Sequence, residues 1–252
     1  MAMIVSIHSF RGGAGKSNIL ADVASQLARR GRRVGIVDLD VQSPGIHSHF
    51  GLDEDRFDRV LNDYLAGCCP IEQVAHDISG RIGAEGSLFL IPSRLRASEV
   101  AHVLQQGYDL ALLDEGCSEL IDKLRLDLLF TNSHPGLNEE TLVTFAICDL
   151  LVLILCPDRK FYQGTAVTVD VARRLEVPDI FLVINKALKL YDWSELRQQA
   201  ETTYRCPVAS ILPLSEDVAR LASAGVFSLH YPEHPFTQGI GEIVACIERA
   251  GD

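Results

Sequence analysis

Short apolar runs alternate along the chain with longer segments in which apolar residues recur at helical spacing. The runs lack the strict polar alternation of a sheet with one solvated face, and helix-length segments separate them, which is typical of parallel strands covered on both faces. The pattern predicts an α/β fold, with a mostly parallel, twisted sheet and helices on both faces. The predicted strands cover residues 3–8, 33–38, 88–91, 126–131, 150–156, 180–185 and 208–212.

The segment after the first predicted strand has the spacing of a helix. Its apolar residues recur three or four positions apart, and a basic turn followed by Gly31 is a typical helix end. Residues 51–86 carry the weakest strand signals, and we expect a helical excursion on the surface there. No linker or internal repeat divides the sequence, so residues 1–252 are expected to form one domain.

Charge and cysteine content narrow the class of protein. Lys and Arg total 23 against 34 Asp and Glu, and the net charge of −11 does not support broad attraction to nucleic acid or anionic lipid. A local cluster could still touch DNA phosphates: Arg29, Arg30, Arg32 and Arg33. The seven cysteines form no C-x-x-C pair, the longest apolar run (residues 150–156) is too short to span a bilayer, and no signal peptide is evident. We expect a cytoplasmic protein with reduced thiols.

Residues 9–17, SFRGGAGKS, form a glycine-rich segment between the first predicted strand and helix. Such a loop directs backbone N–H groups and the positive end of the helix at one point, which suits a phosphate group. Lys16 would add a charge for the outer phosphates, and the Ser17 hydroxyl can ligate Mg²⁺. The usual pattern G-x-x-x-x-G-K-S/T requires glycine where Phe10 stands.

This loop resembles that of the deviant Walker A ATPases, a family that includes the MinD and ParA proteins. Their pattern K-G-G-x-G-K-S/T lacks the first glycine, and here Arg11 stands in place of the signature lysine. The resemblance implies a P-loop NTPase architecture, ATP and Mg²⁺ as cofactors, and a homodimer that forms on ATP binding, with Arg11 reaching the nucleotide of the other subunit. It also implies nucleotide contacts from Gly12, Gly13, Ala14, Gly15, Lys16, Ser17 and Asn18.

A second block ends the next predicted strand with two aspartates, Asp38 and Asp40, followed by Pro44. Alone, two aspartates after a strand could form a solvated strand end or a helix cap. The block is similar to the family motif D-x-D-x-x-x-P. That resemblance implies that Asp40 orients the attacking water and that Asp38 is an outer partner of the metal or of Ser17.

Two segments compete for the Walker B strand, whose terminal aspartate normally holds Mg²⁺ through water. Residues 108–116 contain an apolar run that ends in an acidic residue, Asp114, as such a strand requires. Residues 126–136 end in NSHPG, which is similar to the family endings D-x-x-P-G and D-x-P-x-G, with Asn132 in the aspartate position. We prefer Asn132 and keep Asp114 as the alternative. An amide can accept a hydrogen bond from a metal-bound water but carries no charge, so slow hydrolysis is expected.

Two later strand ends fit base recognition. Asn185 and Lys186 lie at the end of one predicted strand, and residues 212–217, which include Pro213, lie at the end of another. Ligands dock at such strand ends, and the resemblance implies adenine contacts from these positions. The last helix carries an apolar stripe suited to packing on the domain: Ile240, Ile243, Val244 and Ile247. Because Arg249 is its one basic residue, it is not the basic amphipathic helix with which MinD-type proteins grip membranes.

Three functional hypotheses follow. The leading one is a MinD/ParA-like ATPase that binds ATP and Mg²⁺, dimerises face to face, recruits an unidentified partner or activator, and acts in intracellular positioning or partitioning. The second is a nucleotide-dependent switch or scaffold that does not hydrolyse, because of Asn132 and Arg11. The third is a metabolic P-loop ligase or a cluster-loading ATPase, and the lack of a C-x-x-C pair argues against the latter.

Overall fold

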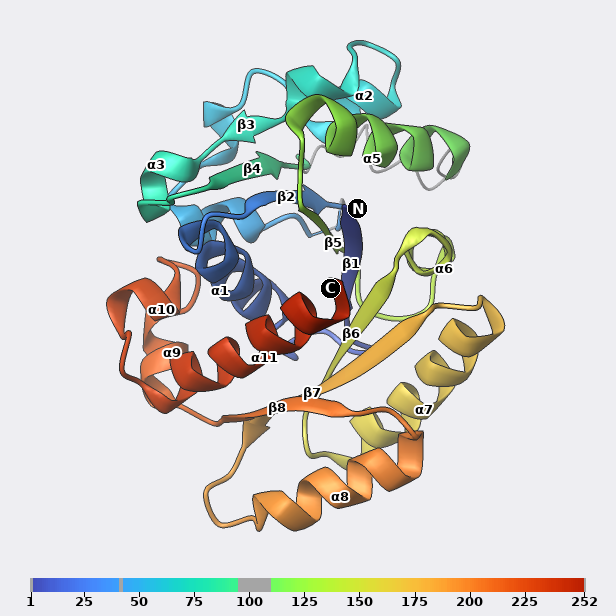
Figure 1. Cartoon of the computed structure of the whole chain (residues 1–252), viewed down its shortest axis with the longest axis vertical. Helices are drawn as coiled ribbons and strands as arrows, with labels where there is room; N and C mark the ends of the chain where they lie inside the picture. The colour runs from blue at the N-terminus through green and yellow to red at the C-terminus, as the bar shows by residue number, and fades with distance from the viewer. Residues whose placement is uncertain (1, 41–42, 95–109, 252) are drawn as a thin grey trace.

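The computed structural model describes residues 2–40, 43–94 and 110–251, whose strands form one twisted sheet (Figure 1). The eight strands lie in the order β3-β4-β2-β5-β1-β6-β7-β8. Neighbouring strands pair in parallel, except that β3 runs antiparallel to β4 at one edge. Their bounds are β1 Met3–His8, β2 Arg33–Asp38, β3 His76–Asp77, β4 Ser87–Ile91, β5 Leu128–Asn132, β6 Leu150–Leu155, β7 Asp179–Ala187 and β8 Val208–Pro213.

The predicted parallel sheet is confirmed, and most strand bounds agree to within two residues. Central strands are recognisable because both of their faces are covered: every residue of β5 and β6 is buried. Strand β3 was not predicted, since a two-residue strand has no periodicity to detect.

Helices cover both faces of the sheet (Figure 1). The helices α1 and α11 pack together on one face, whereas α5, α6, α7 and α8 lie on the other. The helical bounds are α1 Lys16–Arg29, α2 Leu61–Leu65, α3 Ser79–Ile82, α5 Leu110–Leu124, α6 Glu139–Ile147, α7 Arg159–Arg174, α8 Trp193–Tyr204, α9 Glu216–Leu221, α10 Phe227–His230 and α11 Pro235–Gly251. The apolar stripe expected in the last helix is fully buried in α11: Ile240, Ile243, Val244 and Ile247.

Residues 51–86 form short elements rather than long helices. They comprise α2, α3, β3 and the 3-10 helices η2 (Glu54–Arg56) and η3 (Ile71–Val74), after η1 (Ile46–Phe50). This segment packs against α5, where the Tyr64 hydroxyl donates to the backbone carbonyl of Leu112 at 2.8 Å. Val74 and Leu120 belong to the same buried cluster. The excursion therefore covers the β4 side of the sheet.

The strand order creates a crevice at the carboxyl end of β1. From β1 the chain crosses through α1 to β2 on one side, while β6, β7 and β8 lie on the other side. The point at which the order of parallel strands reverses is where α/β sheets bind ligands, because the connections there leave in opposite directions. The glycine-rich loop begins at this point. In the part of the chain described, no helix is both long and apolar enough to cross a membrane.

Candidate functional site

The glycine-rich loop joins β1 to α1 through two left-handed residues. Gly13 has φ 78° and Gly15 has φ 94°, a conformation that costs most other residues roughly 1–2 kcal/mol. A Cβ atom at Gly15 would also lie 2.5 Å from Asn185 Nδ2. Gly15 is the residue that precedes α1 and offers no side-chain cap, so the N–H groups of the first turn remain available to an anion.

Hydrogen bonds from the strand ends hold this loop in place. Asn185 Nδ2 donates to the Ala14 carbonyl at 2.8 Å, and Lys186 Nζ donates to the Gly13 carbonyl at 2.7 Å. On the other side, the Gly136 N–H donates to the Ser9 carbonyl at 3.3 Å. The loop is thus shaped by the protein itself, which reduces the entropy lost when a ligand binds.

Lys16 and two aspartates gather beside the loop. Lys16 is 9% exposed, and Asp38 at the end of β2 is fully buried, with Asp40 two residues later also buried. Burial lowers the pKa of Lys16, and the negative charges of Asp40 and Asp38 oppose that shift. Among the described residues, the Lys16 ammonium group forms no hydrogen bond or ion pair, although the charges of Asp40 and Asp38 act on it. It is therefore available to a phosphate.

Asn132 ends β5 directly beside Asp38, which is its register partner on β2. Asn132 Nδ2 donates to Asp38 Oδ1 at 2.9 Å, while the amide oxygen of Asn132 is buried and has no partner among the described residues. Burial raises the pKa of Asp38 to about 7. An orphaned acceptor beside a buried carboxyl group fits a hydrated Mg²⁺, whose water would donate to the amide oxygen and whose charge would stabilise the carboxylate.

The alternative Walker B residue lies elsewhere. Asp114 is exposed in the middle of α5 and does not end a strand. Tyr108 and Asp109 of that segment lie outside the described residues, as do Val41 and Gln42 of the two-aspartate block. Of the two residues, Asn132 is the one at the end of a central strand.

Asp40 has a partner that sequence reasoning missed. His134 Nδ1 lies 2.7 Å from Asp40 Oδ1, and the Ser43 N–H donates to the same oxygen at 3.0 Å. His134 lies two residues after Asn132, at the end of the strand that pairs with β2. The signal in the sequence was therefore a polar residue just beyond the end of a strand that neighbours the aspartates. A second missed pair lies behind the loop, where buried His8 meets Ser133 Oγ at 2.9 Å through Nδ1. Burial lowers the pKa of His8 to about 3, so it is neutral.

A pocket of about 340 Å³ opens next to the loop. Side chains from α9 and α11 make its wall largely apolar, and its size suits a nucleoside. The structure brings five of the residues predicted to contact the nucleotide into this pocket: Gly13, Gly15, Asn18, Asn185 and Pro213. The two segments expected to recognise the base also supply Lys186, Leu214 and Ser215 to this pocket. Its other wall residues were not predicted from the sequence: Val218, Ala219, Ala222 and Phe236.

The remaining loop residues differ in exposure. Arg11 is exposed, and no hydrogen bond or ion pair of its guanidinium occurs among the described residues. Ser17 is half-buried in the first turn of α1. Phe10, at the position of the usual glycine, packs on Gly164 of α7, where a Cβ atom would lie 1.9 Å from the Phe10 ring. The missing side chain of Gly164 makes room for the aromatic ring.

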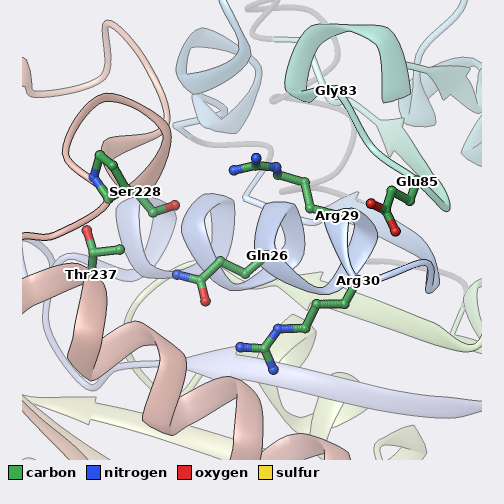
Figure 2. A pocket seen from close by; sticks show the side chains of 8 residues that line it. Gln26, Arg29, Arg30, Gly83, Glu85, Ser228 and Thr237 are labelled. Carbon is green, nitrogen blue, oxygen red and sulfur yellow. The ribbon is translucent and has the colours of Figure 1, made fainter.

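A larger hollow of about 460 Å³ lies on the α1 and α11 side of the sheet (Figure 2). Figure 2 shows Gln26 of α1 across from Thr237 of α11, with Arg29 at the end of α1 and Arg30 directly after it. It contains no residue of the glycine-rich loop. Much of the nearby basic cluster is engaged within the chain, since Arg30 Nη1 pairs with Glu248 at 2.8 Å and Arg33 Nη2 donates to the Leu124 carbonyl at 2.7 Å. The loop is the better candidate site.

Comparison with known proteins agrees with this geometry. Residues 5–229 match the family model described as the CobQ/CobB/MinD/ParA nucleotide binding domain. An uncharacterised ATP-binding protein of Methanocaldococcus jannaschii is 27% identical over 97% of this chain and 87% of its own length. An iron-sulfur cluster carrier protein of Clostridium perfringens is 25% identical over 92% of this chain and 83% of its own length.

Solved structures share the fold. The septum site-determining protein MinD of Pyrococcus horikoshii, in complex with Mg-ADP, superimposes with a TM-score of 0.81. The alignment covers 99% of this chain and 97% of that one, at 20% sequence identity. At this identity the likeness establishes the fold alone.

Proposed function

Since this chain belongs to the CobQ/CobB/MinD/ParA nucleotide-binding family, we propose that it is a cytoplasmic MinD/ParA-like ATPase, built as one domain, that acts in intracellular positioning or partitioning. In this proposal ATP and Mg²⁺ bind at the glycine-rich loop, and two subunits close face to face over the nucleotides. The closed homodimer then recruits a partner protein, and hydrolysis reopens it.

One observation carries the proposal: a cradle for phosphates, a buried lysine and a nucleoside-sized pocket lie side by side. The loop residues Gly13 and Gly15 belong to the pocket wall, so a base in the 340 Å³ pocket would direct its phosphates along the loop. Lys16, at the end of the loop, supplies the charge that phosphates require. This combination is unusual outside nucleotide sites.

Each polar residue of the site has a role in this proposal. Ser17, Asp38 and Asn132 would hold a hydrated Mg²⁺, which would neutralise charge at the phosphates. Asp40 accepts a hydrogen bond from the attacking water and so orients it toward the γ-phosphate. Lys16 stabilises the negative charge on the phosphate oxygens.

The exposed Arg11 supports a role between subunits. Its guanidinium is not used within the described part of the chain, although it lies in the loop that would hold the phosphates. An arginine can bind phosphate oxygens with two parallel hydrogen bonds, and arginines supplied by a neighbouring molecule can accelerate phosphoryl transfer. ATP would then favour the closed dimer because only that state offers Arg11 from both subunits.

A switch that binds ATP without hydrolysing it is the second candidate, and Asn132 is the observation that favours it. The amide donates to Asp38 and contributes no negative charge to the metal. A cluster-loading ATPase has less support. No group of three or more metal-ligating side chains occurs in the described ranges, and burial raises the pKa of Cys117 and Cys148 to about 12. A ligase would hydrolyse ATP only with a carboxylate or amine co-substrate.

Solution mass and phosphate release, measured together with ATP and Mg²⁺, test the proposal. We expect a dimer that depends on ATP and a slow release of phosphate without any co-substrate. The Lys16→Ala variant should lose at least about tenfold in ATP affinity, because it removes the cation at the phosphates. Arg11→Ala should still bind ATP but fail to dimerise, and Arg11→Lys should recover the dimer.

The outcomes separate the candidates. A protein that dimerises with ATP and releases no phosphate is the switch, and one that releases phosphate only with a co-substrate is the ligase. If the native chain binds no ATP in a direct titration, the proposed function is wrong. If Arg11→Ala dimerises like the native chain, the role between subunits is wrong while nucleotide binding stands.

A further inference from the structure

We propose that His134 is a positioning residue for ATP hydrolysis, which holds the Asp40 carboxylate in the orientation that receives the attacking water. This inference rests on the proposed function, in which Asp40 orients that water. It concerns a residue outside the glycine-rich loop, at a position that the family ending D-x-x-P-G leaves unspecified.

The contact is short and one-sided. Both hydrogen bonds of the Asp40 carboxylate among the described residues end on Oδ1, one from His134 Nδ1 at 2.7 Å and one from the Ser43 N–H at 3.0 Å. Two donors on one oxygen fix the rotation of the carboxylate about its Cβ–Cγ bond. The other oxygen, Oδ2, is left to accept from a ligand or a water in the site.

The proton arrangement follows from the partners. A carboxylate can only accept, so Nδ1 of His134 carries the hydrogen and donates it to Asp40. The imidazole is 28% exposed, against 11% for the Asp40 side chain. The ring therefore links a buried carboxylate to the surface, and its second nitrogen needs no buried partner.

His134 is itself held by a rigid loop. The next residue, Pro135, restricts the backbone, and Gly136 has φ 95° and donates its N–H to the Ser9 carbonyl at 3.3 Å. The carbonyl of Gly136 accepts a hydrogen bond from Thr141 Oγ1 at 2.9 Å. The imidazole is thus fixed relative to the same loop that would hold the phosphates.

This geometry matters for rate more than for binding. A nucleophilic water must lie within a narrow range of positions, and a carboxylate that rotates freely spends less time orienting it. Ser43 alone would leave Asp40 with one donor. Loss of the imidazole donor should therefore lower kcat and leave the affinity for ATP nearly unchanged.

A matched pair of substitutions tests the inference. In His134→Asn the amide nitrogen can take the place of Nδ1 and donate to Asp40, whereas His134→Leu has no donor. We expect His134→Leu to lower kcat about tenfold with KM and the Kd of ATP within about twofold, and His134→Asn to recover most of the lost rate. In an Asp40→Asn background, His134→Leu should have no further effect.

The controls separate folding, binding and chemistry. Thermal unfolding and the Kd of a non-hydrolysable ATP analogue show that each variant is folded and binds nucleotide. The inference is overturned if His134→Leu keeps the native kcat, if His134→Asn is no better than His134→Leu, or if the native protein binds ATP but hydrolyses none. A native protein that binds no ATP would overturn the proposed function as well.

Discussion

The amide of Asn132 is predicted to stabilise the buried carboxyl group of Asp38, and replacing it with aspartate tests this. The Asn132→Asp substitution keeps the size of the side chain. It removes the N–H donor that lies 2.9 Å from Asp38 Oδ1 and puts a second carboxyl group in its place. Asp38 is fully buried, so water cannot screen the change.

The size of the effect follows from this geometry. A hydrogen bond to a charged group contributes about 1.5–3 kcal/mol, and two like charges about 4 Å apart repel by about 4 kcal/mol at an effective dielectric constant near 20. The repulsion is partly relieved because two adjacent carboxyl groups can share one proton. Without nucleotide, we expect the free energy of unfolding to fall by about 3 kcal/mol near pH 8 and by about 1 kcal/mol near pH 5.5.

The pH dependence has a definite sign. Burial already raises the pKa of Asp38 to about 7 in the native chain. A carboxyl group whose pKa is raised on folding contributes stability that is complete below its unfolded pKa, about 4, and is lost as the pH rises through its folded pKa. A second buried carboxyl group adds to this loss of stability at high pH. The difference in the free energy of unfolding between the native chain and Asn132→Asp therefore grows as the pH rises.

Urea unfolding at the two pH values measures the deficit, with and without ATP and Mg²⁺. Bound Mg²⁺ would favour the two carboxylates, so the deficit should shrink when both are present, and phosphate release should be faster than in the native chain. The control is the exchanged pair, Asp38→Asn with Asn132→Asp, which restores one amide and one carboxyl group. Native-like stability of Asn132→Asp near pH 8, or a deficit that the exchanged pair does not reduce, would refute the reasoning.

Three further changes give distinct readouts. Gly164→Ala places a Cβ atom 1.9 Å from the Phe10 ring and should cost about 2 kcal/mol in thermal unfolding, a loss that added Phe10→Ala relieves; native stability of the single variant contradicts the packing. Burial raises the pKa of Asp22 to about 6, so the free energy of unfolding of the native chain, measured with urea, should fall by about 2–3 kcal/mol between pH 4 and pH 7. In Asp22→Asn the free energy of unfolding should depend less on pH, and an equal pH dependence in both proteins would contradict the assignment. Gly15→Ala, at φ 94°, should weaken binding of a fluorescent ATP analogue about tenfold, and unchanged affinity would show that the loop tolerates a side chain there.

Local patterns predicted the elements that have strong periodicity. The sequence placed β1 and β2 to the residue, because their apolar runs are bounded on both sides by turn or loop residues. The run around Leu110–Leu113 suits a strand or a helix equally well, and only packing decides. In α5, Leu113, Cys117 and Leu120 are buried at helical spacing against the short elements that precede β4.

Part of the candidate site could be predicted from the sequence because that part, too, depends on local patterns. Gly13, Gly15 and Lys16 form a contiguous loop, and its chemistry follows from backbone conformation and spacing alone. The partners of this loop come from distant segments. His134 meets Asp40 across 94 residues, and the apolar wall of the nucleoside pocket comes from α9 and α11, whose sequences carry no binding motif.

The sequence by itself determined that an anion cradle sits between a buried strand and a helix, since left-handed glycines and free N–H groups at a helix start are local properties. The tertiary structure decided which side chains complete it. Strand neighbours in a parallel sheet are chosen by long-range pairing, and the order β2-β5-β1-β6 is what puts Asn132 beside Asp38 and carries His134 to Asp40. Likewise, the space that accepts Phe10 exists only because Gly164 lies opposite it in the folded chain.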